Sequence, residues 1–221
     1  MSRRRSQPLG LGLVALVVAG TAVVTSPSAN AATTYTAPLR TAVRALPVAA
    51  ESNAGYNRDL YFGRWGDANR DCQDTRSEVL VQESRVTATG GCKINYGRWS
   101  SYFDNRTYTS ATSVQIDHLV PVAEAWGSGA RTWTQARRVA FYNDLGDRRA
   151  LNAMTSALNS SKGARGPEQW MPPYAAARCR YISDWAAIKH RWSLKVDSVE
   201  RAALIRWADS CPNVTITVVR P

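Results

Sequence analysis

Two short segments, far apart in the chain, carry the side chains best suited to chemistry. Asp117 and His118 adjoin in "SVQIDHLVPVAEAW", and Asn159 and Lys162 lie one helical turn apart in "LNSSKGAR". A neutral imidazole can take a proton from water near pH 7. Carboxylate and amide oxygens are ligands that Mg²⁺ accepts, and a lysine cation can meet a phosphate. Together these groups predict hydrolysis of a phosphodiester bond.

The elements that must position these groups can be read from the surrounding residues. Val114 and Ile116 alternate with polar neighbours, which predicts a strand that ends before Pro121. "TSALNSSK" predicts a helix that ends at Gly163. Neighbouring residues of a strand face opposite sides, so Asp117 and His118 converge only if the strand ends or bulges there.

The motifs resemble those of the HNH (His-Me finger, ββα-metal) endonucleases. Within that superfamily the chain is most similar to secreted bacterial nucleases related to the GmrSD-type C-terminal nuclease domain. The resemblance implies an α+β fold, with a ββα-metal finger at approximately 110–170 and additional helices around it. The matching segments are "RWGDANRDCQDTRSEVL", "IDHLVP", "DHLVPVAEAWGSGA", "NDLGD" and "LNSSKGARGPEQW".

The resemblance assigns roles to individual residues. His118 becomes the general base, and Asp117 and Asn159 become ligands of one divalent metal, Mg²⁺ first and Mn²⁺ as the alternative. The implied substrate is DNA, or alternatively RNA, cut to leave 5′-phosphate ends. We expect little sequence preference, because nothing in the sequence indicates a module that reads bases. The predicted contacts to phosphate or substrate are Lys162, Arg165 and Arg76. The predicted supporting residues beneath the site are Glu78 and Asp74.

The chain departs from the family pattern at one position. The central asparagine that orients the base would fall near Ala150, and alanine cannot do this. Asn152, Asn143 or a backbone carbonyl are the alternatives, and the sequence leaves them open. The gap supports a rival function, a secreted polyanion-binding protein without catalysis on a degenerate finger. A third hypothesis is a metal-independent hydrolase or peptidase that uses His118.

An acidic loop precedes these segments. Positions 1, 3, 5 and 12 of a calcium-loop pattern are filled, but position 6, which favours glycine, is Cys72. Thr75 and Glu78 also fit a capping box at the start of a helix. Two interpretations of the loop therefore stay open: a second, calcium-binding site and a purely structural role. The calcium candidates are Asp67, Asn69, Asp71 and Glu78.

The start of the chain has the pattern of a secretory signal peptide. A basic start at Arg3–Arg5 precedes an apolar run and the small-residue pattern "ANA" at Ala29–Ala31. We expect residues 1–31 to be removed and residues 32–221 to form one extracellular domain, monomeric and outside the membrane. The net charge of +11 becomes +8 without the three signal arginines. That charge suits a polyanionic partner, and equally suits solubility.

Four cysteines remain after export, and three pairings are open. We favour Cys72–Cys92 and Cys179–Cys211, because each pair brackets one local region and leaves "DHLVP" between them. No pair has the C-x-x-C spacing typical of zinc sites, which weakens that interpretation.

Other segments complete the expected fold. Leu39, Val43 and Leu46 predict one apolar helix face, and Gly90–Gly91 predicts the turn of a hairpin. Trp185 and Trp192 fit the buried face of an amphipathic helix. Helices are also predicted within 132–146, 174–194 and 197–211, and a strand within 213–219. Basic pairs that could contact phosphate or simply face solvent are Arg137 with Arg138 and Arg148 with Arg149.

Overall fold

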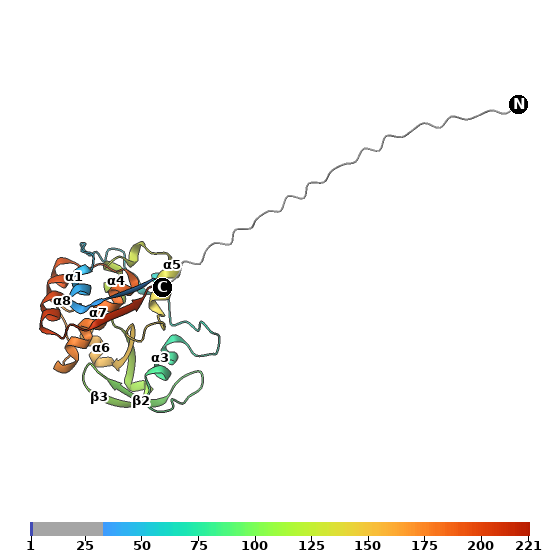
Figure 1. Cartoon of the computed structure of the whole chain (residues 1–221). Coiled ribbons are helices and arrows are strands. Elements are labelled where there is room, and N and C mark those ends of the chain that lie inside the picture. The colour runs from blue at the N-terminus through green and yellow to red at the C-terminus, as the bar shows by residue number, and fades with distance from the viewer. Residues whose placement is uncertain (2–32) are drawn as a thin grey trace. The chain divides into compact units, whose positions relative to one another are not determined.

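Eight α-helices and three two-stranded antiparallel sheets form the described part of the chain, Met1 and residues 33–221, in this computed structural model (Figure 1). Strands and helices mix along the chain, which confirms the α+β class. In chain order the elements are β1 (Thr34–Pro38), α1 (Leu39–Ala45), α2 (Arg58–Tyr61), α3 (Thr75–Glu83), β2 (Tyr96–Ser101), β3 (Arg106–Ser110), β4 (Val114–His118), α4 (Val122–Gly127), α5 (Gln135–Tyr142), β5 (Leu151–Thr155), α6 (Ser156–Lys162), α7 (Arg178–Trp192), α8 (Ser198–Ser210) and β6 (Thr215–Val219).

The domain boundaries stay predictions. Apart from Met1, the predicted signal peptide (1–31) lies outside the described residues. No helix among the described residues combines the length and the apolar character needed to cross a bilayer.

The first and last strands pair with each other. β1 runs antiparallel to β6, and α1 starts directly after β1 and packs against α7 and α8 (Figure 1). Leu39, Val43 and Leu46 are buried, as their spacing predicted. Trp185 and Trp192 of α7 are also buried, which confirms their place in the core.

A buried ammonium group joins three helices. Lys189 on α7 donates from Nζ to Glu124 on α4 at 2.6 Å and to Glu200 on α8 at 2.9 Å. Carboxylate oxygens of Glu51, Glu124 and Glu200 lie within 4.8 Å of one another around this group. A buried cluster of carboxylates needs a compensating cation, and Lys189 supplies it. The cluster therefore has a structural explanation in the contacts of α4, α7 and α8.

Two local predictions in the first half of the domain were wrong. Asp74, not Thr75, caps α3, because the Asp74 side chain accepts a hydrogen bond from the Ser77 amide. The regular hairpin pairs β2 with β3, whereas Gly90–Gly91 lies in a loop closed by one isolated bridge, Thr89 to Tyr96. Glycines mark a turn in the backbone but do not say how many residues pair on either side of it.

Two disulfides hold the domain together in the predicted pairing. Cys72–Cys92 joins the acidic loop to the loop before β2, and Cys179–Cys211 joins the start of α7 to the end of α8. The described residues contain no free cysteine. Each bridge restricts the unfolded chain and so favours the folded state.

Candidate active site

A strand–strand–helix unit carries the residues predicted to do chemistry. β4 pairs antiparallel with β5 in an unbroken register from Val114–Thr155 to His118–Leu151, and α6 follows β5 without a gap. The Thr155 side chain caps α6 by accepting from the Leu158 amide, and Gly163 ends the helix with a positive φ of 56°. α6 packs against both strands. The unit therefore brings the end of β4 and the end of α6 together.

The His118 ring is held by a backbone carbonyl. Its Nε2 lies 2.8 Å from the Tyr142 carbonyl oxygen, which can only accept, so Nε2 carries the proton. Nδ1 is then the lone-pair nitrogen and has no hydrogen-bond partner among the described residues. The sequence left three alternatives for the group that orients the His118 ring: Asn152, Asn143 or a backbone carbonyl. The geometry selects the backbone carbonyl. Asn152 donates instead to the Arg149 carbonyl, and Asn143 binds the Gly66 amide and Thr75.

Aromatic rings enclose the imidazole and set its charge. Trp65 stacks on His118 at 5.1 Å between ring centroids, and Phe141 lies at 6.0 Å on an almost parallel plane. Burial lowers the pKa of His118 to about 3; the Tyr142 carbonyl opposes this shift, and Arg58 and Lys162 add to it. The imidazole is therefore neutral at physiological pH, which is the form that accepts a proton.

Asp117 forms a buried ion pair with Lys162. The Lys162 Nζ lies 2.9 Å from each carboxylate oxygen, donating a hydrogen bond to Oδ1, and also donates to the His118 carbonyl at 2.8 Å. The side chains of Lys162 and Asp117 are 0% and 5% exposed. Burial raises the pKa of Asp117 and lowers that of Lys162, while each charge opposes the shift of the other. Lys162 thus faces Asp117 in the interior and not a surface open to phosphate.

Asn159 lies on the same helix, nearer to solvent. Its Nδ2 donates to Gln115 Oε1 at 3.1 Å, and its side-chain oxygen has no hydrogen-bond partner among residues 33–221. Gln115 and Asp117 are two positions apart on β4 and share a face. Asp117 and Asn159 therefore lie on one side of the strand pair. The regular register, without a bulge, directs His118 to the other side at the strand end.

The other predicted phosphate contacts make hydrogen bonds to backbone carbonyls. Arg76 donates to the carbonyls of Ala111 and Val114 at 2.9 Å, which fixes the start of β4 from α3. Arg165 is exposed and donates to the carbonyls of Ser161 and Lys162. A role in binding substrate stays a prediction for both arginines.

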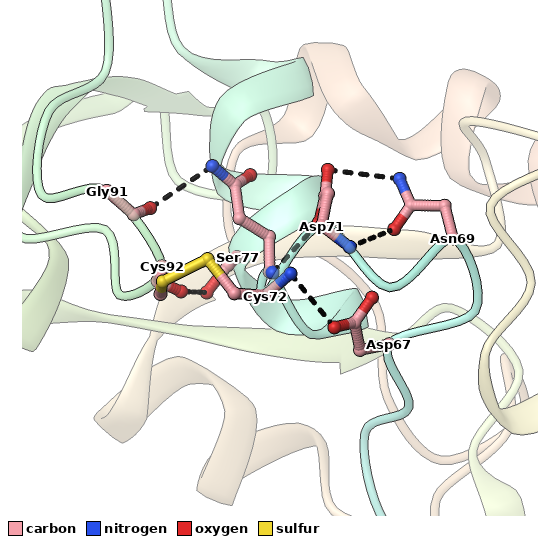
Figure 2. Close-up of a disulfide and its surroundings, with 8 residues drawn as sticks. Asp67, Asn69, Asp71, Cys72, Ser77, Gly91 and Cys92 are labelled. Carbon is pink, nitrogen blue, oxygen red and sulfur yellow. Dashed lines mark hydrogen bonds between the residues drawn. A yellow bond between two sulfur atoms is a disulfide. The ribbon is translucent and has the colours of Figure 1, made fainter.

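The acidic loop is held by its own side chains, as Figure 2 shows. The Asp67 carboxylate accepts from the Cys72 amide at 3.0 Å, and Asp71 accepts from the Gln73 amide at 2.9 Å. Asn69 donates to Asp71 at 3.0 Å and to Glu78 at 3.1 Å. Calcium binding by this loop stays a prediction, and Asp74 and Glu78 have structural contacts here.

The sequence did not single out the residues around a cavity beside His118. This cavity of about 540 Å³ is lined by Trp65, Tyr142, Arg58 and Arg64, among others. Arg58 donates to the Tyr142 hydroxyl at 2.7 Å and lowers the pKa of both Asp117 and His118. Among the residues that line this cavity, only Trp65 had a sequence signal of a possible substrate contact, because it lies beside Gly66 in a loop. Arg58 comes from α2, a helix of four residues that no periodicity could reveal.

Glu83 is a second carboxylate that the sequence did not single out. It ends α3, and its Oε2 accepts from the Ala153 amide of β5 at 2.9 Å. Burial raises its pKa to about 7, opposed by this hydrogen bond and by Arg180 and Arg148. The carboxyl is thus partly protonated near neutral pH.

Glu83→Gln is expected to remove a pH dependence of stability. Between the usual pKa of 4.5 and about 7 the folded protein holds the proton more tightly than the unfolded chain. The free energy of unfolding therefore falls as pH rises through this window, by up to about 1.4 kcal/mol per pH unit. Glutamine still accepts from Ala153 and does not titrate, so the variant should be the more stable protein at pH 8. Urea unfolding from pH 4.5 to 8 measures this, and parallel curves for the two proteins would contradict it.

Comparison with known proteins places this site in a nuclease-type domain. Residues 71–207 match the model of the family described as GmrSD restriction endonucleases, C-terminal domain. The chain belongs to this family, and the matched segment contains both the Asp117–His118 strand and the Asn159–Lys162 helix. The chain is also 39% identical over 158 residues to an uncharacterized secreted protein of Arthroderma benhamiae, covering 71% of this chain and 76% of that protein. No solved structure matches the chain.

Proposed function

We propose that this protein is a secreted, metal-dependent endonuclease of the HNH type, which hydrolyses DNA phosphodiester bonds with little sequence preference. The observation that carries the proposal is the His118 imidazole, neutral and fixed at Nε2 by the Tyr142 carbonyl. This leaves Nδ1 as a proton acceptor at the end of β4. The family of nuclease-type domains supports the same reaction class.

His118 and its neighbours can perform the proton transfer. Nδ1 takes a proton from the attacking water, and the Tyr142 carbonyl keeps its hydrogen bond to Nε2 while positive charge develops on the ring. Arg58 and Arg64 line the adjoining cavity and provide cations for phosphate oxygens. The bond that breaks is to the 3′-oxygen, by family resemblance, which leaves a 5′-phosphate.

Asp117 and Asn159 are the residues that would hold a divalent metal, most simply Mg²⁺. Asp117 Oδ2 is buried and, although it lies 2.9 Å from the Lys162 ammonium, accepts no hydrogen bond from it, so this oxygen keeps a lone pair that a second cation could use. Asn159 offers an amide oxygen on the same side of the strands, whereas the His118 ring leaves β4 on the other side. The phosphate that is cut would therefore have to lie across the end of β4 to meet both. When bound, the metal stabilises negative charge on the phosphate and on the leaving oxygen.

One observation favours a second function. Lys162 compensates Asp117, so the carboxylate is satisfied without any metal. A polyanion-binding protein without catalysis could keep this arrangement, and the positive net charge suits it. Both functions predict that the protein binds DNA with an affinity that falls steeply with salt.

Plasmid nicking with and without Mg²⁺ separates the two functions. The endonuclease converts supercoiled plasmid to open-circle and linear forms with Mg²⁺ or Mn²⁺, and EDTA stops the reaction. Binding in a gel-shift assay without any nicking in either metal would leave the polyanion-binding function. Nicking that is unaffected by EDTA would remove the metal from the proposal.

Asn159→Ala is expected to raise the Mg²⁺ concentration needed for half-maximal nicking by about tenfold or more, because a ligand oxygen is lost. Gln115→Ala is the matched control, since it removes the hydrogen-bond partner of Asn159 but leaves the amide oxygen in place. A magnesium titration of the three proteins measures the effect. Superimposable curves for Asn159→Ala and the native chain would remove Asn159 from the metal site.

A further inference from the structure

A second polar cavity lies along the free side of β5. This cleft of about 350 Å³ is bounded by the end of α3, by β2 and by the first turn of α7. Its floor includes Glu83 and Asn152, and three arginines line it: Arg85, Arg148 and Arg180. None of them belongs to the His118 cavity or to the Asp117–Lys162 pair.

The positive charge of this cleft is largely uncompensated. Arg148 is exposed and has no hydrogen-bond or ion-pair partner within residues 33–221. Arg85 donates from Nε to the neutral Ser100 hydroxyl at 3.2 Å. Arg180 alone meets a carboxylate, Asp184 at 3.2 Å, through a side chain that is 59% exposed. The Asp184 side chain is only 10% exposed, but the contact engages the Nε of Arg180 alone, so the other guanidinium N–H groups stay available to a second partner.

The floor adds little negative charge. Glu83 is mostly buried and engaged by the Ala153 amide, and burial raises its pKa to about 7. Arg148 and Arg180 line the same cleft as Glu83, and their charges lower the pKa of this carboxyl. An anion entering the cleft thus meets several guanidinium groups and little opposing charge. Phosphate is the anion whose geometry suits arginine best, because two N–H groups can bind two of its oxygens.

The cleft lies beside the strand that carries the candidate active site. Asn152 on its floor is the register partner of Asp117 on β4. Residues opposite each other in an antiparallel pair share a face and have Cα atoms about 4.5–5.5 Å apart. A nucleic-acid strand that crosses the end of β4 can therefore continue over β5 into the cleft.

We propose that the Arg85–Arg148–Arg180 cleft binds backbone phosphates of the nucleic acid next to the phosphate that is cut. The inference rests on the proposed nuclease function and adds a substrate-binding site to it. Such contacts hold and orient the strand without reading its sequence.

Charge-matched variants test the cleft. Arg148→Gln and Arg148→Gln/Arg180→Gln remove one and two cleft charges, and Arg131→Gln/Arg206→Gln removes two exposed charges outside it. Binding of a fluorescent DNA duplex is measured by anisotropy in EDTA at several salt concentrations, so that no cleavage occurs. Each lost phosphate contact should weaken binding about tenfold and reduce the slope of log K against log salt by about 0.9. The control pair should change both quantities less.

The outcomes separate this proposal from the nuclease function. If the native protein binds and nicks DNA, and the cleft variants match the control pair in affinity and salt slope, the cleft proposal is overturned and the nuclease function stands. If the native protein neither binds nor nicks DNA, both are overturned. Arg148 has no partner to lose, so Arg148→Gln should keep the native melting temperature and remains informative if the double variant does not fold.

Discussion

Replacing His118 with alanine is expected to reduce plasmid nicking by about 10²–10⁴-fold, the range typical of a lost general base. The reason is that Nδ1 is the proton acceptor left by the Tyr142 hydrogen bond, and alanine supplies none. The rate is measured as loss of supercoiled plasmid at saturating Mg²⁺. DNA binding in EDTA should change little, because the ring is enclosed by Trp65 and Phe141 and carries no charge.

His118→Gln controls for the cavity that alanine leaves among the aromatic rings. The glutamine amide can still donate to the Tyr142 carbonyl but cannot accept a proton near neutral pH. We therefore expect it to be as inactive as His118→Ala and closer to the native melting temperature. Nicking at the native rate by either folded variant would exclude His118 as the base.

Lys162→Met is expected to lower the free energy of unfolding by about 3–5 kcal/mol, because it leaves the buried Asp117 carboxylate without its cation. The native ammonium lies 2.9 Å from both carboxylate oxygens and is fully buried. Urea denaturation in EDTA measures the loss. Lys93→Met, at an exposed lysine, should change stability by no more than about 0.5 kcal/mol.

The double variant Asp117→Asn/Lys162→Met identifies the cause of that loss. Removing both charges abolishes the unpaired ion, so the double variant should be more stable than the sum of the two single changes implies. Strict additivity would mean that Asp117 and Lys162 do not interact, in conflict with their contact. Protonation of Asp117 should also make Lys162→Met less destabilising at low pH.

Much of the fold was predictable because local patterns determined it. The alternation at Val114 and Ile116 predicted β4, Gly163 marked the end of α6, and the bracketing of local regions predicted Cys72–Cys92. Errors arose where two local signals competed. Asp74 and Thr75 are both good capping residues, and only the structure shows that Thr75 instead donates to the Gly66 carbonyl and to Asn143.

The candidate site was harder to predict because its partners are distant in sequence or are backbone atoms. The sequence assigned Asp117 and Lys162 to one site and predicted a phosphate contact for the lysine, whereas the structure shows the lysine against Asp117. A fully buried lysine is rare without a partner, and the sequence gives no sign of which way the side chain turns. The role of the Tyr142 carbonyl could not be predicted for a different reason. Every residue has a backbone carbonyl, so the sequence does not show which one contacts His118. Only the position of the C-terminal end of α5 in the fold places the Tyr142 carbonyl at His118.

If Asp117 holds a metal as proposed, the Lys162 ammonium separates assembly of the site from binding of that metal. Many small metal-binding domains stay unfolded until the ion arrives, because unpaired ligands repel one another or remain unsolvated. Here the chain carries its own cation for the buried carboxylate. Such a protein can fold in metal-poor surroundings and remain folded but inactive there. Its chemistry would then begin only where the surroundings supply the ion, and chelation would switch it off reversibly.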